Sequence, residues 1–306
     1  MTVAFISHPD CRLHEMGPRH PERPARLAAI SDQLVASRID VLLRHYEAPP
    51  ATRDQLVRVH DPRYVDQIHA GRPEAGLVWL DGDTAMNPKS ADAASRASGA
   101  IINGIDMVMS GEVRAAFCGV RPPGHHAERA RAMGFCLFNN VAVGAAHAME
   151  VHGVTRIAII DFDVHHGNGT EDIFRDEARV LFCSSFQHPF YPGTGADTVS
   201  DHIINVPLPA GTDGATFRAA AQTRWLGVLD DFKPELILIS AGFDAHAEDP
   251  LAQLEFVESD YAWITEQLKQ VADDHAQGRI VSTLEGGYDL SALGRSAAAH
   301  IKALID

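Results

Sequence analysis

The sequence predicts an α/β domain in which a central, mostly parallel sheet is flanked by helices on both faces. Strand-like and helix-like segments alternate along the chain, as in doubly wound α/β proteins. Most strand-like segments are short and continuously apolar rather than alternating, which indicates strands that are buried on both faces. The length of 306 residues suits one large α/β domain, and we predict a single domain over residues 1–306.

The strongest strand-like segments are Val3–Ser7, Ala115–Gly119, Arg156–Asp163, Val180–Ser185, Leu236–Ala241 and Arg279–Leu284. Helical periodicity between them predicts helices over Pro24–Ala36, Pro62–Ala70, Lys89–Met109, Asn140–His152, Ala215–Asp231, Asp260–Ala276 and Leu290–Leu304. We find no internal repeat and no low-complexity linker.

Composition excludes several classes of function. The net charge of −15 repels phosphate backbones, so we expect no nucleic-acid binding. The four cysteines form no CxxC pair, which argues against a disulfide framework or a thiolate zinc site and favours a cytoplasmic protein. The N-terminal segment lacks the features of a signal peptide, and the apolar runs are too short to span a membrane.

Four polar clusters each follow a predicted strand. They are RPPGHH (121–126), DFDVHHGNGT (161–170), SAGFDAH (240–246) and LEGGYD (284–289). Ligands of open parallel sheets bind beyond the carboxyl ends of the strands. The sequence therefore predicts one functional site built from all four clusters.

The second and third clusters contain a candidate metal site. Alternate residues of an extended strand end face the same way, so Asp163 and His165 can point into one cavity. Asp244, after another strand, supplies a third ligand. Catalytic zinc sites use three protein ligands and leave one position open. Two carboxylates make such a site less selective for zinc, so Fe²⁺ or Co²⁺ also fit.

The other two clusters supply groups for acid–base chemistry. His125 and His126 can take a proton from water and return one to a leaving group, and Asp161 is a natural partner for one of them. Gly286 and Gly287 allow the backbone to approach a ligand closely. Tyr288 then presents a phenol that can stabilise an oxyanion.

The motifs RPPGHHA, GFCLFNN, DFDVHHGNGT, AGFDAH and EGGYD resemble the histone deacetylase and acetylpolyamine amidohydrolase superfamily, which has an arginase-like fold. The resemblance extends from HPERPARL (20–27) to EGGYD (285–289). Asn168 in HGNGT is similar to the class II and bacterial branch, because class I has Asp there. Asn168 orients His126 without ionising, which implies a less basic His126 than in class I.

The resemblance implies a role for each site residue. Asp163, His165 and Asp244 bind one Zn²⁺, His126 is the main base and acid, Asp161 orients His125, and Tyr288 holds the oxyanion. Substrate contacts are implied for Gly134, Phe135, Tyr191, Leu251 and Gly287. One or two K⁺ sites are implied as well. The first involves Asp161, Asp163, His165, Ser184 and Ser185, and the second involves Phe174 and Val180.

The predicted reaction is hydrolysis of an acetyl or short acyl amide of lysine or another amine to a carboxylate and a free amine. Alternatives are an acetylpolyamine amidohydrolase, an arginase-like dimetal hydrolase and a non-catalytic acyl-amine binding module. Polyamine-selective relatives can carry glutamate where Leu251 follows Asp249-Pro250. The resemblance also implies a tunnel for the substrate, and Glu15, Glu22 and Asp81 remain candidate carboxylates at its mouth. A homo-oligomer is possible.

Overall fold

The continuously apolar segments form the middle of one parallel sheet. The computed structural model describes residues 2–306, and its eight-stranded sheet has the order β2-β1-β5-β10-β9-β6-β7-β8. All neighbouring strands in it pair in parallel. The strands are β1 (Val3–Ser7), β2 (Leu43–Glu47), β5 (Ala115–Cys118), β6 (Ile157–Asp161), β7 (Val180–Gln187), β8 (Ile203–Leu208), β9 (Leu236–Ala241) and β10 (Ile280–Leu284).

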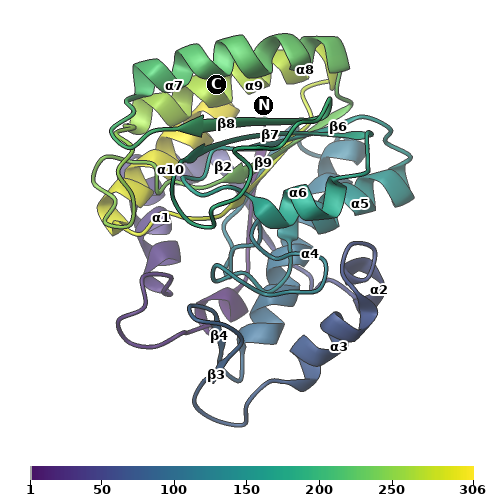
Figure 1. The fold of residues 1–306 in the computed structure, drawn as a ribbon, viewed down its shortest axis with the longest axis vertical. Coiled ribbons are helices and arrows are strands. Elements are labelled where there is room, and N and C mark those ends of the chain that lie inside the picture. The colour runs from purple at the N-terminus through teal and green to yellow at the C-terminus, as the bar shows by residue number, and fades with distance from the viewer. Residues whose placement is uncertain (1) are drawn as a thin grey trace.

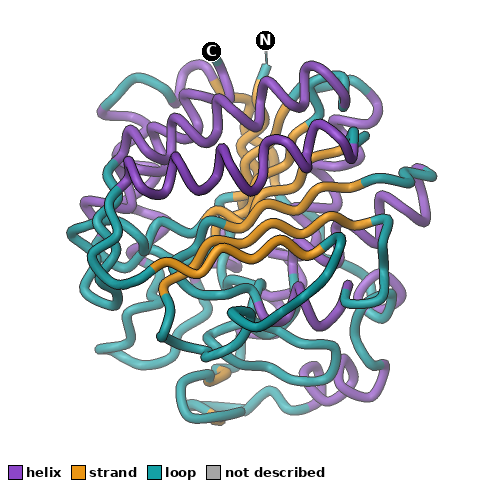
Figure 2. The backbone as a smooth tube through the Cα atoms, turned by 45° about the horizontal axis from the view of Figure 1, so that its top comes forward, coloured by secondary structure: helices purple, strands orange, loops and turns teal. Residues whose placement is uncertain are grey.

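Helices cover both faces of this sheet, which confirms the predicted α/β fold. Figure 1 shows α7, α8 and α9 on one side of the strands and α4, α5 and α6 on the other. In Figure 2 the strands run side by side as a twisted layer between helices. The helices are α1 (Ala25–Ala36), α4 (Ser90–Ser110), α5 (Asn140–His152), α6 (Asn168–Phe174), α7 (Gly214–Ala221), α8 (Gly227–Phe232), α9 (Glu258–His275) and α10 (Leu290–Ile305).

The segment between β2 and α4 lies outside the sheet. It contains α2 (Arg53–Leu56), α3 (Pro62–Ala70) and the short antiparallel pair of β3 (Val78–Trp79) and β4 (Ala85–Met86). These elements lie away from the α7–α9 layer, at the bottom of Figure 1. Short 3-10 helices cover Pro9–Arg12 and Asp40–Leu42, and one π-helical turn, Gln222–Leu226, joins α7 to α8.

Two helices begin at residues next to the functional clusters. The side chain of Asn139 caps α5 by accepting a hydrogen bond from the Ala142 N–H, and Asp289 caps α10 by accepting one from the Ala292 N–H. Such caps satisfy backbone donors that have no partner within the helix. They fix the chain where it leaves the predicted site.

The structure corrects several predicted boundaries. The strand predicted over Arg156–Asp163 ends at Asp161, so Asp163 and His165 lie in the bend after the strand rather than on its extended end. The edge strands β2 and β8, the β3–β4 pair, α2 and α6 were not predicted. Among residues 2–306, no helix combines the length and apolar character that crossing a membrane requires.

Candidate metal-binding and catalytic site

The four polar clusters meet at the carboxyl edge of the sheet, as the sequence predicts. The tandem histidines follow β5, the first two predicted metal ligands follow β6, Asp244 follows β9 and Tyr288 follows β10. These four strands are neighbours in the order β5-β10-β9-β6. The parallel topology therefore brings the clusters to one edge although they are distant in sequence.

Asp163, His165 and Asp244 form a buried cluster whose ligand atoms all lie within 4.8 Å of one another. His165 Nδ1 is 3.0 Å from Asp163 Oδ1 and 3.2 Å from Asp244 Oδ2. The Val164 N–H fixes the other oxygen, Asp244 Oδ1. Asp244 Oδ2 is buried and has no hydrogen-bond partner among the described residues, which leaves this oxygen available to a ligand.

The electrostatics of the cluster fit a divalent cation. Burial disfavours a charged imidazole, but the neighbouring carboxylates of Asp163 and Asp244 outweigh it and raise the pKa of His165 to about 10. Burial and the nearby charge of Asp163 raise the pKa of Asp244 to about 7. His165 and Asp244 therefore hold their protons strongly when no metal is bound. A metal ion replaces such protons when it binds.

Close backbone packing holds the two carboxylates in place. The Gly286 N–H donates to Asp163 Oδ2 at 2.8 Å. A Cβ atom at Gly286 would lie 2.0 Å from Asp244 Oδ2, closer than real Cβ contacts. Glycine is thus required here because the loop after β10 packs directly against the candidate metal ligands.

The tandem histidines lie beside this cluster, each with a different partner. Their ring centroids are 4.0 Å apart. His125 Nδ1 donates to Asp161 Oδ2 at 2.9 Å, and His126 Nδ1 is 2.8 Å from Asn168 Oδ1. Both contacts agree with the pairing expected from the sequence.

The partners give the two rings opposite properties. Burial works against the charged form of His125, but the charges of Asp161 and Asp163 outweigh it and raise its pKa well above the ordinary value. Burial, followed by the charges of His125 and His165, lowers the pKa of His126 well below it. His126 is therefore the neutral member of the pair and has a ring nitrogen that can accept a proton.

Tyr288 lies at the same edge with its phenol kept neutral. Burial and the negative charge of Asp244 raise its pKa well above the ordinary value. The Arg26 guanidinium lies 5.1 Å from the centroid of its ring, and the Tyr288 N–H donates to Asp249 Oδ2 at 2.7 Å. A neutral phenol in a fixed place is a hydrogen-bond donor suited to a developing oxyanion.

Two supporting residues, Glu285 in the LEGGYD motif and Asp249 three residues after SAGFDAH, were given no role by sequence reasoning. Glu285 Oε2 accepts hydrogen bonds from the Gly124 and His125 N–H groups at 2.6 and 3.1 Å. Asp249 accepts from the backbone of Tyr288, as above. Each connects two clusters that are remote in sequence, and their acidic character in strand-end loops was the only signal.

Aromatic rings surround the cluster. Gly134 has φ +55°, and a Cβ there would lie 2.3 Å from the His126 ring. Phe135 adopts the left-handed φ of +70°, and its ring meets Tyr288 edge-on at 5.9 Å. Tyr191 lies edge-on to His126 at 5.2 Å. Phe190, which was not predicted, stacks on the His165 ring at 5.4 Å.

Comparison with known proteins identifies the family. The histone deacetylase domain matches residues 20–304. The chain belongs to the histone deacetylase family. This finding confirms the resemblance drawn from the motifs and places the chain among hydrolases of the deacetylase and amidohydrolase type.

The chain is similar to proteins of several organisms. The chain is 40% identical over 309 residues to an uncharacterized protein of Synechocystis, with 99% of both chains covered. It is 37% identical to a histone deacetylase-like amidohydrolase of Pseudomonas aeruginosa over 88% of this chain and 72% of the relative. The crystal structure of the HDA15 HD domain matches with a TM-score of 0.92 at 34% identity, covering 99% of this chain and 88% of that one.

The other substrate candidates of this deacetylase domain have mainly structural contacts. The Leu251 N–H donates to Asp249. The Gly287 carbonyl accepts a hydrogen bond from Arg26 Nε at 2.7 Å. Glu22 is fully buried, and its carboxylate is paired with Arg26 and Arg121.

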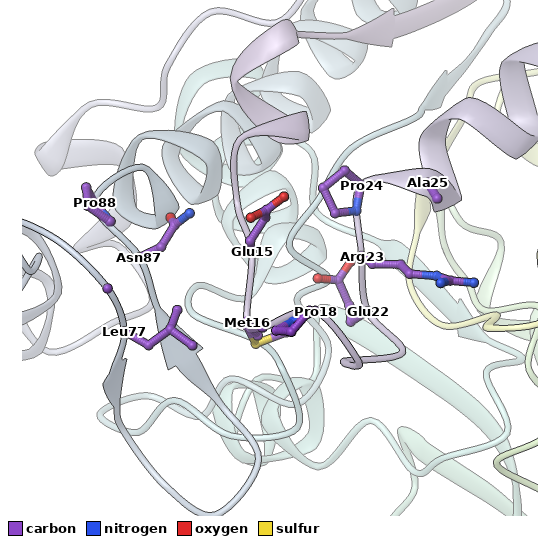
Figure 3. Close-up of a pocket in the computed structure, with 12 residues that line it drawn as sticks. Glu15, Met16, Pro18, Glu22, Arg23, Pro24, Ala25, Leu77, Asn87 and Pro88 are labelled. Carbon is purple, nitrogen blue, oxygen red and sulfur yellow. The ribbon is translucent and has the colours of Figure 1, made fainter.

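Asp81 and Glu15 lie at different places on the surface. Asp81 Oδ1 caps its own turn by accepting from the N–H groups of Asp83 and Thr84, and Asp81 lines a cavity together with Tyr191. Glu15 borders a cavity of about 740 Å³, whose lining is shown in Figure 3. None of the metal-cluster residues or the tandem histidines lines that cavity.

The residues predicted to bind monovalent cations divide into two cases. Ser184 pairs with Asp161 across β6 and β7, and its hydroxyl is buried without a hydrogen-bond partner among the described residues. That orphaned oxygen fits a cation site. The Phe174 carbonyl accepts hydrogen bonds from the Glu177 N–H and from His202 Nε2, so it is already satisfied at the place predicted for a second cation.

Proposed function

We propose that this protein is a zinc-dependent amidohydrolase that removes acetyl or other short acyl groups from acyl-lysine or acylated amines. The observation that carries the proposal is the convergence of three metal-ligand atoms next to a neutral histidine and a neutral, buried phenol. A single three-ligand cluster at this edge favours one metal ion over the two of an arginase-like centre. The presence of a base and an oxyanion donor favours catalysis over simple capture of acyl amines.

Each side chain has a role in the proposed reaction. Asp163, His165 and Asp244 would hold the zinc ion, which when bound supplies a Lewis acid for the substrate carbonyl and for water. His126 accepts a proton from the attacking water through its free ring nitrogen. Tyr288 donates its hydroxyl hydrogen bond to the carbonyl oxygen as negative charge develops there.

The second half of the reaction returns that proton. The bond between the acyl carbon and the amide nitrogen breaks, and His126 passes its proton to the departing nitrogen. One water is consumed, and a carboxylate and an amine are released. His125, held by Asp161, keeps a positive charge beside the site throughout.

The substrate assignment rests on the walls of the site. Phe135 and Tyr191 offer aromatic faces for an aliphatic stem. Leu251 supplies no charge at the position after Asp249-Pro250, which removes one reason to favour a polyamine. We therefore propose acyl-lysine or a simple acylated amine, with acetylpolyamine as the alternative. We further propose one K⁺ ion beside Ser184 and Asp161 in this single catalytic domain.

The replacement Tyr288→Phe tests the proposal most directly. It removes one oxyanion donor, and we expect turnover of an acetyl-lysine peptide to fall by roughly 10²–10³-fold while bound zinc, measured by plasma mass spectrometry, stays the same. Tyr46→Phe is the matched control. It also removes one phenol hydroxyl, but the Tyr46 hydroxyl donates to Glu112 in an exposed contact that involves none of the site residues. Unchanged turnover in Tyr288→Phe would exclude the proposed role.

Substrate class is decided by a direct comparison. Acetyl-lysine peptides and N-acetylated polyamines should be assayed side by side, with and without a chelator. The proposal expects hydrolysis of at least one class that disappears with the chelator and returns with zinc. A kcat/KM clearly higher for the polyamines would select the alternative.

A further inference from the structure

His126 can act as a base only if its proton is on one particular ring nitrogen. Its Nδ1 faces the side-chain amide of Asn168. If the amide presents oxygen, Nδ1 carries the proton and Nε2 is free to accept one. If the amide presents its NH₂ group, the proton is driven to Nε2 and the base is lost. The orientation of one amide thus decides whether His126 is competent.

The structure contains a group that fixes this orientation. Asn168 Nδ2 lies 2.8 Å from Glu128 Oε1. An ionised carboxylate only accepts hydrogen bonds, so the NH₂ group of Asn168 must face Glu128 and its oxygen must face His126. Longer contacts from the same Nδ2 to Met133 Sδ at 3.3 Å and to the His126 carbonyl at 3.4 Å support the same orientation more weakly.

We propose that Glu128 is a positioning residue which, by orienting the Asn168 amide, sets the tautomer of His126. The proposal rests on the proposed function for the role of His126 as a base. The order of contacts is Glu128 to Asn168 to His126, and Glu128 does not touch the reacting atoms.

Glu128 itself is held on a fixed backbone. Its N–H donates to the Arg131 carbonyl at 2.9 Å, and its carbonyl accepts from His60 Nδ1 at 3.0 Å. His60 Nε2 accepts from the Asn139 N–H. Burial lowers the pKa of His60 to about 4, so this ring is neutral and holds one tautomer. The Glu128 carboxylate therefore approaches Asn168 from a defined place.

The neighbouring histidine has no need of such a device. His125 bonds to the Asp161 carboxylate, and either carboxylate oxygen accepts a proton whichever way the group turns. Asn168 is asymmetric, and a second acceptor must remove the ambiguity. Glu128 and Asn168 both line a cavity of about 410 Å³, so water can reach this pair and replace a deleted carboxylate.

Glu128→Gln is the decisive variant. It preserves the size of the side chain and its ability to form hydrogen bonds, but the new side chain is no longer only an acceptor. Glutamine can accept from Asn168 or donate to it, so both amides can turn together. We expect the ¹⁵N signals of the His126 ring in zinc-loaded protein to show a new population protonated at Nε2. Glu128→Ala should show the same change, with kcat lower by about tenfold, as for other orienting partners. Glu266→Ala, at an exposed position on α9, is the control.

A merely structural role gives a different result. Glu128→Gln would then match the wild type in both kcat and ring tautomer, and that outcome would overturn the proposal. A second background checks the order of contacts. In Asn168→Asp either carboxylate oxygen can accept from His126, so Glu128→Ala in that background should leave kcat unchanged. It should also relieve the repulsion between the two neighbouring carboxylates. A full tenfold loss in that background would also contradict the proposal.

The two proposals can fail separately. If no acyl amide is hydrolysed by the wild type, the proposed function fails, while the ring tautomer in Glu128→Gln still tests the positioning role. If hydrolysis is found but the tautomer and kcat are unaffected by both Glu128 variants, only the positioning role fails. Thermal unfolding of each variant identifies any loss of fold.

Discussion

Among residues 2–306, two groups of aspartate and histidine side chains have ligand atoms within 4.8 Å of one another, and their surroundings differ. The first is the buried cluster of Asp163, His165 and Asp244. The second, which we call the surface cluster, consists of Asp106, His147 and His152. In the surface cluster both Nε2 atoms contact the same Asp106 oxygen, at 2.8 and 2.7 Å, and the Asp106 side chain is 48% exposed.

The groups behind the ligands separate the two clusters. A histidine that binds a metal through one nitrogen usually donates its other N–H to an acceptor. At the surface cluster, Arg58 Nη1 lies 3.1 Å from His147 Nδ1. Arginine only donates, so His147 carries its proton on Nε2 and directs it at Asp106. That tautomer leaves no lone pair of His147 facing Asp106.

The buried cluster differs in how its carboxylates are held. Backbone N–H groups hold the outer carboxylate oxygens, and Asp244 Oδ2 is left without a hydrogen bond among the described residues. Carboxylate and imidazole groups at such distances therefore do not by themselves make a metal site. The second layer of hydrogen bonds decides which lone pairs are available.

The largest expected effect comes from removing one ligand in each cluster. Asp244→Asn should lose zinc and lower turnover at least about a thousandfold, because Lewis-acid polarisation contributes several kcal/mol. Asp106→Asn should keep about one zinc per chain and wild-type turnover. Metal analysis and an acetyl-lysine assay on the same preparations measure both. Zinc loss from Asp106→Asn, or full activity in Asp244→Asn, would reverse the assignment of the two clusters.

Much of the central fold was predictable because strands that are buried on both faces have continuously apolar sequences. The middle strands carry continuous apolar runs, and β1 and β9 have the predicted boundaries. The edge strands β2 and β8 lack such continuous apolar runs. Three of the five residues of β2 are exposed, and β8 contains Pro207, which an edge strand tolerates because it needs no ladder hydrogen bond there.

The residues of the site likewise divide into those that the sequence predicted and those that it did not. Residues within the motifs, such as Asp163 and Tyr288, were predicted because their chemistry and their place after a strand agree. Glu128 and Asp249 were not assigned roles. Their functions depend on contacts between loops that only the folded chain brings together, and a lone acidic residue in a loop is usually solvated. Neither periodicity nor spacing records such a contact.

A smaller effect is expected from converting the surface cluster toward a metal site. Arg58→Gln replaces a donor by a group that can accept from His147 Nδ1–H, which frees Nε2 for a metal. Orienting partners change metal affinity by about 10–100-fold, and we expect a gain of that order for Zn²⁺ at a second site. Calorimetric titration of protein already loaded with one zinc measures it.

Two controls define that experiment. Arg58→Lys keeps a donor and lacks an acceptor, so it should behave as the wild type. Asp106→Asn combined with Arg58→Gln should abolish the gain. A second zinc bound equally well by wild type and Arg58→Gln would show that the contact of Arg58 with His147 does not govern the surface cluster.

The smallest effect is the contribution of the surface cluster to stability. Burial alone would raise the pKa of Asp106, but hydrogen bonds with His147 and His152 hold it below its ordinary value. A depressed carboxyl pKa stabilises the fold above the unfolded pKa of about 3.9, and this contribution is lost as the pH falls through the folded value. Since the group is half-exposed, we expect Asp106→Asn to cost roughly 0.2–1 kcal/mol near pH 6.

Urea denaturation of the wild type and Asp106→Asn at two pH values and two salt concentrations measures this contribution. The difference in unfolding free energy should shrink below about pH 4 and should also shrink in high salt, because exposed charges are screened. A difference that persists in both conditions would mean that Asp106 acts through packing between α4 and α5 rather than through its charge. In that case the surface cluster would be a structural contact whose histidines meet an aspartate only because two helices cross there.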